Sequence, residues 1–270
     1  MKAQLRTIVL ALAVISLLAG CGAKKMDVLL PEMAANFEGI KSYQLTPSLY
    51  IPQAGTDVQV KTSFKCPNKM RADVTYPVSV SVVCDGKKML GCAPDYNTCI
   101  KLDLSDDEGV LPGSALAVLM IPHLNFVQIT DRYDAKVAGK EKLDGKKTVV
   151  FELTRKDEAK TAFQAPKAKI WVEEDRSVPL RMETMDEAGV CKTITILDNF
   201  TEVAGVWMPQ DLRMETGDGM SLVSLSLSDV TVNEEISDDV FSVQAPDDCV
   251  VLDELPAVSP SDIPEILLLY

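Results

Sequence analysis

The chain has 270 residues, a formal net charge of −13 and a single His. With 47% hydrophobic and 25% charged residues, it carries enough apolar side chains to bury a sizeable core, in one large domain or two small ones. Its acidity disfavours binding to nucleic-acid phosphates, and one His is too few for a multi-His zinc site.

A short leader opens the chain. Lys2 and Arg6 precede the apolar run IVLALAVISLLA at residues 8–19, which suits a signal peptide and is too short to span a membrane. The run ends in Leu-Ala-Gly-Cys, which resembles a bacterial lipobox. This resemblance implies cleavage before Cys21 and its acylation; an ordinary secretory signal with an incidental Cys is the alternative. Gly22 in place of Asp favours the outer membrane, if the organism has one.

An amphipathic helix is predicted over residues 26–43, because its apolar residues recur at helical spacing. They are Val28, Leu29, Met33, Phe37 and Ile40. From residue 56 the apolar period changes to two, which is typical of half-buried antiparallel strands. The dipeptides at 85–86 and 144–145 are both Asp-Gly, a hairpin signal.

In the second half of the chain, strands are predicted near 134–143, 146–154, 167–174, 179–186, 190–200, 206–216 and 220–232. The last of these changes phase, which indicates a bulge near Ser228-Asp229. A short helical turn is expected at Asp238 to Phe241. About ten or eleven strands thus follow one helix.

Two segments in the middle of the chain differ from this pattern. Residues 105–110 are acidic and faintly resemble a calcium loop, but the Gly and Glu of such a loop are missing, so a solvated turn is preferred. Residues 112–122 form an apolar stretch bounded by prolines, interpreted as a helix that is either core or a flap. His123 follows it and is interpreted as a packing residue.

The six cysteines after Cys21 are even in number and belong to an exported chain, which favours three disulfides over a metal site. The sequence contains no Cys-x-x-Cys, which disfavours zinc. Six cysteines allow 15 connectivities. The preferred set is Cys92–Cys99 across a hairpin, Cys66–Cys84 at one sheet edge, and Cys191–Cys249 by elimination.

The order of these features resembles the LolA/LolB superfamily of lipoprotein-sorting and lipid-binding proteins over roughly residues 26–250. The resemblance rests on GIKSY at the end of the first helix and on four later segments. These are CPNKMRADV, VVCDGKKML with PDYNTCIKLDL, KLDGKKTVVFEL, and KAKIWVEEDRSVPLRMETMDEAG. Arg71 matches a general Arg of the family and is expected on the polar side of its strand.

The resemblance implies a mostly β (α+β) fold: a strongly curved antiparallel sheet, an incomplete barrel, with helices covering one side of an apolar cavity that accepts acyl chains. Methionine suits such a lining because its side chain adapts to irregular partners. The candidate lining residues are Met70, Met89, Met120, Met182 and Met214. Cys66 stands where the soluble carrier of the family has the Arg that holds its lid.

The predicted organisation is a signal peptide at 1–20, a lipidated tether at 21–25, a LolA-like domain at 26–250 and a Pro-rich tail at 251–270. The predicted function is a membrane-anchored binder of a lipid or of a lipoprotein acyl chain, in lipoprotein sorting or envelope lipid handling. The alternative is an interaction or sensor module for a protein partner. No catalytic or phosphate-binding motif and no cofactor signature is present, so an enzyme is not expected.

Overall fold

The computed structural model describes residues 28–52, 55–76, 79–103, 126, 129–156, 165–247 and 249–252. Most of these residues are in strands. In chain order they are β1 (Ser42–Ile51), β2 (Thr56–Lys65), β3 (Lys69–Tyr76), β4 (Val80–Cys84), β5 (Lys88–Ala93), β6 (Thr98–Asp103), β7 (Tyr133–Leu143), β8 (Lys146–Arg155), β9 (Lys167–Glu173), β10 (Pro179–Met185), β11 (Cys191–Asp198), β12 (Thr201–Val203), β13 (Val206–Met208), β14 (Asp211–Thr216), β15 (Ser221–Val232) and β16 (Val250–Leu252).

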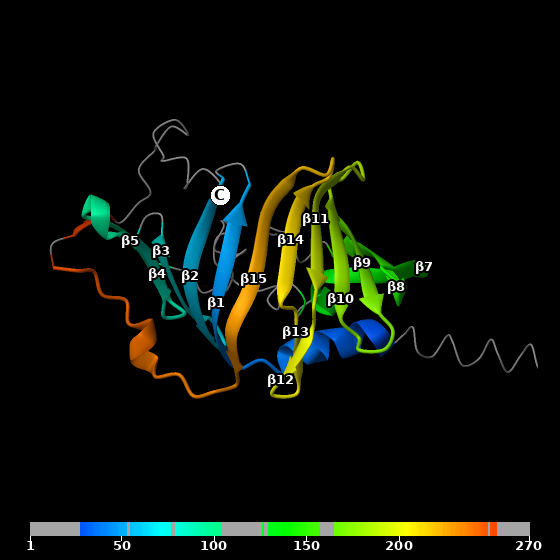
Figure 1. The fold of residues 1–270 in the computed structure, drawn as a ribbon, viewed down its shortest axis with the longest axis horizontal. Helices are drawn as coiled ribbons and strands as arrows, with labels where there is room; N and C mark the ends of the chain where they lie inside the picture. Colours follow the sequence, from blue (N-terminus) through cyan, green and yellow to red (C-terminus); the bar gives the residue numbers. More distant parts are fainter. Residues whose placement is uncertain are drawn as a thin grey trace, which may run out of the picture.

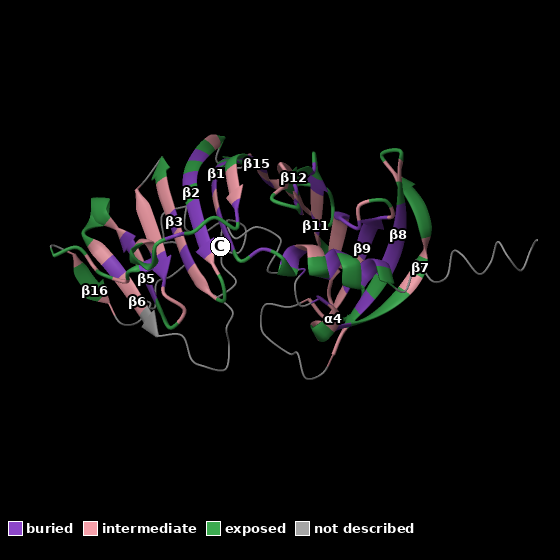
Figure 2. Ribbon diagram, turned by 90° about the horizontal axis from the view of Figure 1, so that it is seen from below, coloured by how far each residue is buried: buried purple, intermediate pink, exposed green. Residues whose placement is uncertain are grey.

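One large sheet dominates the fold (Figure 1). It has 14 strands in the order β16-β6-β5-β4-β3-β2-β1-β15-β14-β11-β10-β9-β8-β7, and its edge strands β16 and β7 do not pair, so it remains open. All its pairs are antiparallel except β16 with β6. The sheet bends into an arch, seen end-on in Figure 2. The predicted curved, open, mostly β architecture is therefore confirmed, whereas ten or eleven strands was too few.

Two of the strands that were not predicted, β12 and β16, have only three residues each. The third, β1, is a long strand at the centre of the sheet. β1 lies between β2 and β15 and was not predicted. From Tyr43 onward its residues alternate between buried and more exposed positions. Pro47 lies within it, and a Pro normally argues against a central strand because it cannot donate to the ladder. The predicted bulge of β15 is confirmed, since the register with β1 shifts between Ser228 and Thr231.

Residues 28–38 are helical, so the helix ends earlier than predicted and the chain enters β1 at Ser42. Four of the five apolar residues of the predicted periodicity are buried: Leu29, Met33, Phe37 and Ile40. They belong to the same core cluster as the strands from β8 to β2. Val28, the fifth apolar residue of the predicted periodicity, is 45% exposed. The helix lies inside the arch of the sheet (Figure 2).

A polar clamp, consisting of Glu32, Asn36, Arg176, Ser177 and Trp207, holds this helix in place. Ser177 Oγ donates to Glu32 Oε2 at 2.9 Å. Asn36 exchanges two hydrogen bonds with the backbone of Trp207, at 3.2 and 3.0 Å. The guanidinium of Arg176 lies 5.2 Å from the ring centre of Trp207.

Arg176 also connects the clamp to the core. Its Nε donates to Glu173 Oε2 at 2.6 Å, and its guanidinium lies 5.7 Å from the ring of Phe200. Glu173 is only 7% exposed, so this pairing compensates a largely desolvated carboxylate.

A second cover runs over the opposite face of the arch, at the β3–β6 end. We call residues 233–249 the strap. Lys65 and Lys69 contact Asp238 at 2.6 and 3.0 Å, and Arg71 Nη1 donates to the carbonyl of Val240 at 3.4 Å. The 3-10 helix η3 (Asp238–Phe241), at the predicted place, buries Phe241 to 1% exposure.

Beyond η3 the strap covers a small apolar cluster and ends in β16. Val243, Ala245 and Cys249 pack against Val83, Leu90, Cys92 and Cys99 on the outside of β4, β5 and β6. The chain then pairs with β6 as β16. The segment predicted as a tail from residue 251 therefore begins inside the sheet.

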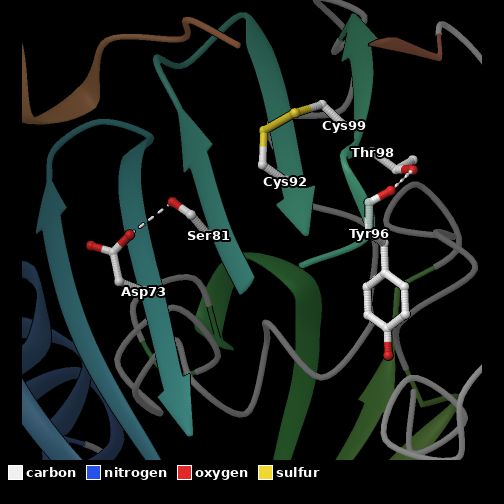
Figure 3. Close-up of a disulfide and its surroundings, with 6 residues drawn as sticks. All are labelled: Asp73, Ser81, Cys92, Tyr96, Thr98 and Cys99. Carbon is white, nitrogen blue, oxygen red and sulfur yellow. Dashed lines mark hydrogen bonds between the residues drawn. A yellow bond between two sulfur atoms is a disulfide. The ribbon is translucent and has the colours of Figure 1, made fainter. Parts of the chain in front are cut away.

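Arg71 lies opposite Met70 and Ala72 on β3, as predicted, where it contacts Asp73. Met70 and Ala72 are buried, while Arg71 Nε donates to Asp73 Oδ2 at 2.7 Å. This hydrogen bond raises the pKa of Arg71. Ser81 Oγ donates to the other oxygen of Asp73 at 2.7 Å (Figure 3).

Cys92 and Cys99 form a disulfide, the pair expected across the β5–β6 hairpin (Figure 3). They are directly paired residues with Cα atoms 4.1 Å apart. The other four described cysteines are free thiols.

The two remaining predicted disulfides are absent. Cys191 begins β11 and Cys249 precedes β16, with eight strands between β11 and β16, so elimination gave a wrong pair. Cys66 and Cys84 are not joined, since Cys66 lies in the turn after β2, beside the chain that enters β1, while Cys84 pairs with Met70 within the sheet. Cys66 Sγ donates to the carbonyl of Ile40 and Cys84 Sγ to that of Asn68, each at 3.4 Å.

Several sequence predictions lie outside the described residues. They concern the signal peptide and Cys21, the acidic and apolar segments between 104 and 125 with Met120 and His123, and the tail after 252. Within the described ranges, no helix has the length and apolar character needed to cross a bilayer.

Removing the cation of the clamp tests its contribution. Arg176→Ala would leave Glu173 buried without its charge partner and would remove two ring contacts, so we expect the free energy of unfolding to fall by roughly 2–3 kcal/mol. Urea unfolding followed by circular dichroism measures the change. Arg213→Ala, at an exposed position, is the matched control and should cost less than about 0.5 kcal/mol. Equal losses in both variants would contradict the clamp.

The strap is tested by its buried aromatic residue. Phe241→Ala should lower the free energy of unfolding by roughly 3–5 kcal/mol, because it leaves a cavity beneath η3. Glu235→Ala, at an exposed strap position, should change it by less than about 0.5 kcal/mol. A loss below about 1 kcal/mol for Phe241→Ala, in the same denaturant titration, would mean that the strap is not part of the folded unit.

Candidate functional site

The side of the sheet that faces the helix, which we call the inner face, is apolar across the arch. Strand alternation places every second residue there, and the register shows which residues share the face. In β3, β4 and β5, for example, Met70, Cys84 and Met89 are aligned. The apolar inner-face residues of the other strands include Phe151, Ile170, Met182, Leu197, Leu212, Met214, Leu225, Leu49, Val58 and Ile100.

No charged residue occupies an inner-face position within the described strands from β6 through β1 to β9. The polar side chains there are hydroxyls such as Thr62, Thr193 and Thr195. Thr62 Oγ1 is buried, with no hydrogen-bond partner in the described part of the structure. The outer face of the same strands carries charged residues, including Lys61, Arg71, Lys169, Arg181 and Glu183. The two faces therefore differ sharply in polarity.

The inner face is covered unevenly. Beside the helix its residues are fully buried, as with Val172, Ile170 and Leu197. Elsewhere several apolar inner-face residues are only partly buried, Val137 on β7 and Val230 on β15 among them, and six others form two groups. They are Val74, Val80, Val82 and Ile100 at the β3–β6 end, and Met182 and Met214 on either side of β11. We call these six residues the open patches; they are apolar surface that a ligand can contact.

The methionines predicted to line a cavity separate into two groups. Met70 and Met89 are on the inner face but buried, at 0% and 9% exposure, so they are core residues. Met182 and Met214 are partly exposed and both are paired with Thr195, so they lie two strands apart on the same face. Met120 lies outside the described residues. The other four residues of the open patches, three valines and one isoleucine, were not predicted to contact a ligand, although the period-two alternation in this part of the chain was recognised.

Ionisable groups on the inner face stay neutral. Burial raises the pKa of the Cys84 thiol and of the Tyr43 phenol. Among the described residues, no group of three His, Cys, Asp or Glu side chains is placed to hold a metal ion. What the face offers chemically is burial of apolar surface.

A small pocket lies near the turn between β7 and β8. Its volume is about 60 Å³, enough for a few water molecules and too small for an acyl chain. Its lining is largely charged: Asp144, Lys146, Arg181, Asp198 and Arg213, with Leu143, Leu180, Ile196 and Leu197. Lys146 already pairs with Asp198 at 2.8 Å. This pocket is therefore distinct from the open patches.

Known structures share this fold. A DUF1329 family protein from Desulfovibrio piger matches with a TM-score of 0.59 and 19% identity, covering 82% of this chain and 97% of its own. A LolA superfamily protein from Nitrosomonas europaea matches at 0.55 and 19%, covering 80% and 96%. A domain from Vibrio parahaemolyticus, described as an outer membrane lipoprotein-sorting protein, matches at 0.58 and 15%, covering 79% and 94%.

At these identities the similarity establishes the fold, and the resemblance to the LolA superfamily predicted from the sequence is confirmed at that level. No curated protein matches the chain. A family model described as "Uncharacterized protein" matches residues 99–245, more than half of the chain. The chain therefore belongs to that family, and its fold is that of the LolA superfamily.

Proposed function

We propose that this protein is an exported lipoprotein that holds an acyl chain, of a lipid or of another lipoprotein, against the open patches of its inner face. The observation that carries the proposal is an uncharged, apolar inner face, between β6 and β9, whose open patches are only partly buried among the described residues. Similarity to a LolA superfamily protein and to a lipoprotein-sorting domain supports the same class of ligand.

The energetics favour this assignment. Each buried methylene contributes on the order of 0.8 kcal/mol, so about eight methylenes give roughly 6 kcal/mol. Partly exposed methionine and valine side chains supply such contacts, and Met182 and Met214 adapt to chains of different shape. Binding then needs no catalytic group, which is why we propose a binding protein rather than an enzyme.

The anchor belongs to the same proposal. Acylation of Cys21 would connect the anchor to the domain through the predicted tether at 21–25, which reaches about 18 Å at most. The domain would stay near the bilayer that holds its anchor, and the absence of Asp at residue 22 favours the outer membrane. An anchored binder of this kind suits lipoprotein sorting or lipid handling in the cell envelope.

Paired substitutions on the inner face test acyl binding. Met182→Gln with Met214→Gln keeps side-chain size but adds polar groups that an acyl chain leaves unpaired, so affinity for a fluorescent palmitoyl probe should fall about tenfold or more. Fluorescence titration of unlipidated protein gives the dissociation constants.

The matched control is Arg213→Gln, which changes the neighbouring residue of Met214 on the outer face and should leave the constant unchanged. An unchanged constant in the double variant, or no saturable binding by the wild-type protein, would contradict the proposal.

The anchor is tested separately. Cys21→Ser should abolish metabolic labelling with palmitate and move the protein from the detergent phase to the aqueous phase, or leave it uncleaved. Phase partitioning of whole-cell extracts measures this. Cys191→Ser, another thiol that forms no disulfide here, is the control and should remain labelled. Continued labelling of the Cys21 variant would refute anchoring, without bearing on the inner face.

A further inference from the structure

Exposed apolar side chains gather at one end of the sheet. β1, β3, β5, β10 and β14 end there, and each leads through a turn into its neighbour. The large exposed residues at these five turns are Tyr50 (42% exposed), Tyr76 (56%), Tyr96 (59%), Val190 (55%) and Met220 (54%). We call this set the hairpin rim; it includes the upper ends of β1, β14 and β15 in Figure 1.

The opposite end of the sheet differs. Its turns at 66–68, 85–87, 144–145 and 174–178 have no large exposed apolar residue among the described positions. Turns normally carry polar residues, and single exposed apolar side chains need no explanation. Five turns at one rim each carry such a residue, whereas the described turns at the other rim carry none, and this pattern marks a contact surface.

The rim extends to the edge of the sheet. Val250, 61% exposed, donates its N–H to the carbonyl of Asn97 in the turn that carries Tyr96. From that turn to the turn of Val190, nine strand spacings of about 4.8 Å give roughly 43 Å along the arch. This length accommodates the 20–30 residues that a protein typically contributes to a stable interface.

The charge of the rim selects the partner. Asp57, Asp95 and Asp218 are exposed at the turns of Tyr50, Tyr96 and Met220. A hydrogen bond from Thr216 lowers the pKa of Asp218, so it is ionised at neutral pH. The described residues of these turns, 50–52, 55–57, 76, 79–80, 94–98 and 216–221, include no Lys or Arg. Only the fifth turn has cations near it, with Lys192 paired to Asp186 at 2.9 Å.

We propose that the hairpin rim docks a protein whose contact surface carries Lys or Arg side chains among apolar ones. Tyrosine is enriched at protein interfaces, and its ring attracts cations from its face while the nearby carboxylates attract them at longer range. An anionic bilayer attracts Lys and Arg and repels these carboxylates. A second copy meeting rim to rim would place like charges together.

Peptides of defined chemistry test the rim in the full chain. A peptide of alternating Arg and Leu should bind the wild-type protein saturably, and one of alternating Glu and Leu should not. The affinity for the Arg-Leu peptide should fall about tenfold or more in the triple variant Tyr50→Ser, Tyr76→Ser and Tyr96→Ser. All three side chains are substantially exposed, so the melting temperature should not change. Fluorescence anisotropy gives the affinities.

A separate variant tests what the carboxylates of the hairpin rim contribute to peptide binding. The triple variant Asp57→Asn, Asp95→Asn and Asp218→Asn should bind the Arg-Leu peptide more weakly. Its affinity should also depend less on salt concentration, because salt screens ionised groups. Asp144→Asn with Asp175→Asn, at the opposite end of the sheet, is the matched control and should change neither quantity. Val28→Ser is the control for the tyrosines.

Three results would overturn the proposal. The peptide could bind the tyrosine variant as tightly as the wild type. A palmitoyl probe could displace the bound peptide, or the double variant Met182→Gln with Met214→Gln could abolish peptide binding. Either result would place the peptide on the inner face. The tyrosine variant could lose flotation with phosphatidylglycerol vesicles while retaining peptide binding, which would make the rim a membrane contact.

Discussion

The fold depends on one constraint: strand alternation sends every second side chain of a 14-stranded sheet to the same side. Because these side chains are apolar from β6 to β9, the sheet must bend and acquire a cover to remove them from water. An antiparallel sheet can leave its other face solvated, and here the outer face is charged along most of its width. Curvature, helix and strap all follow from this asymmetry.

The helix and the strap cover apolar side chains on opposite faces of the sheet. The helix at 28–38 lies over the inner face, where Glu32 accepts a hydrogen bond from Ser177 and Asn36 donates one to the carbonyl of Trp207. The strap covers the outer face at the β3–β6 end, where Val83 and Leu90 are apolar. Among the described residues, the helix leaves part of the inner face incompletely buried, including the six residues of the open patches. The proposed ligand site is thus apolar surface that the described elements cover only in part.

Much of this architecture could be predicted from the sequence because it depends on local pattern. Period-two alternation located most strands, and the phase change in β15 located a bulge. The central strand β1 was missed because Pro47 masked its alternation, and β16 because three residues are too few to give a period. The Cys191–Cys249 pair failed because strand order across the sheet is not a local property.

An apolar ligand site was predicted from the sequence, but only two of the six residues of the open patches, Met182 and Met214, were named for it. Methionine was chosen for its chemistry, yet Met70 and Met89 are core residues, at 0% and 9% exposure. Val74, Val80, Val82 and Ile100 carry no chemical signature, and their partial exposure depends on how the chain packs in three dimensions. The hairpin rim could not be inferred from the sequence, since its members share no motif and meet only through the strand order.

The most direct measurement of the central claim locates a bound acyl chain on the protein. A fatty acid with a paramagnetic label near its methyl end, added to protein with isotope-labelled Val, Ile and Met methyl groups, broadens the NMR signals of methyl groups close to it. Our account predicts selective broadening at the open patches, including Val82 and Met214, with Val83 and Val190 unaffected. Broadening confined to the hairpin rim, or none at saturating fatty acid, would contradict it.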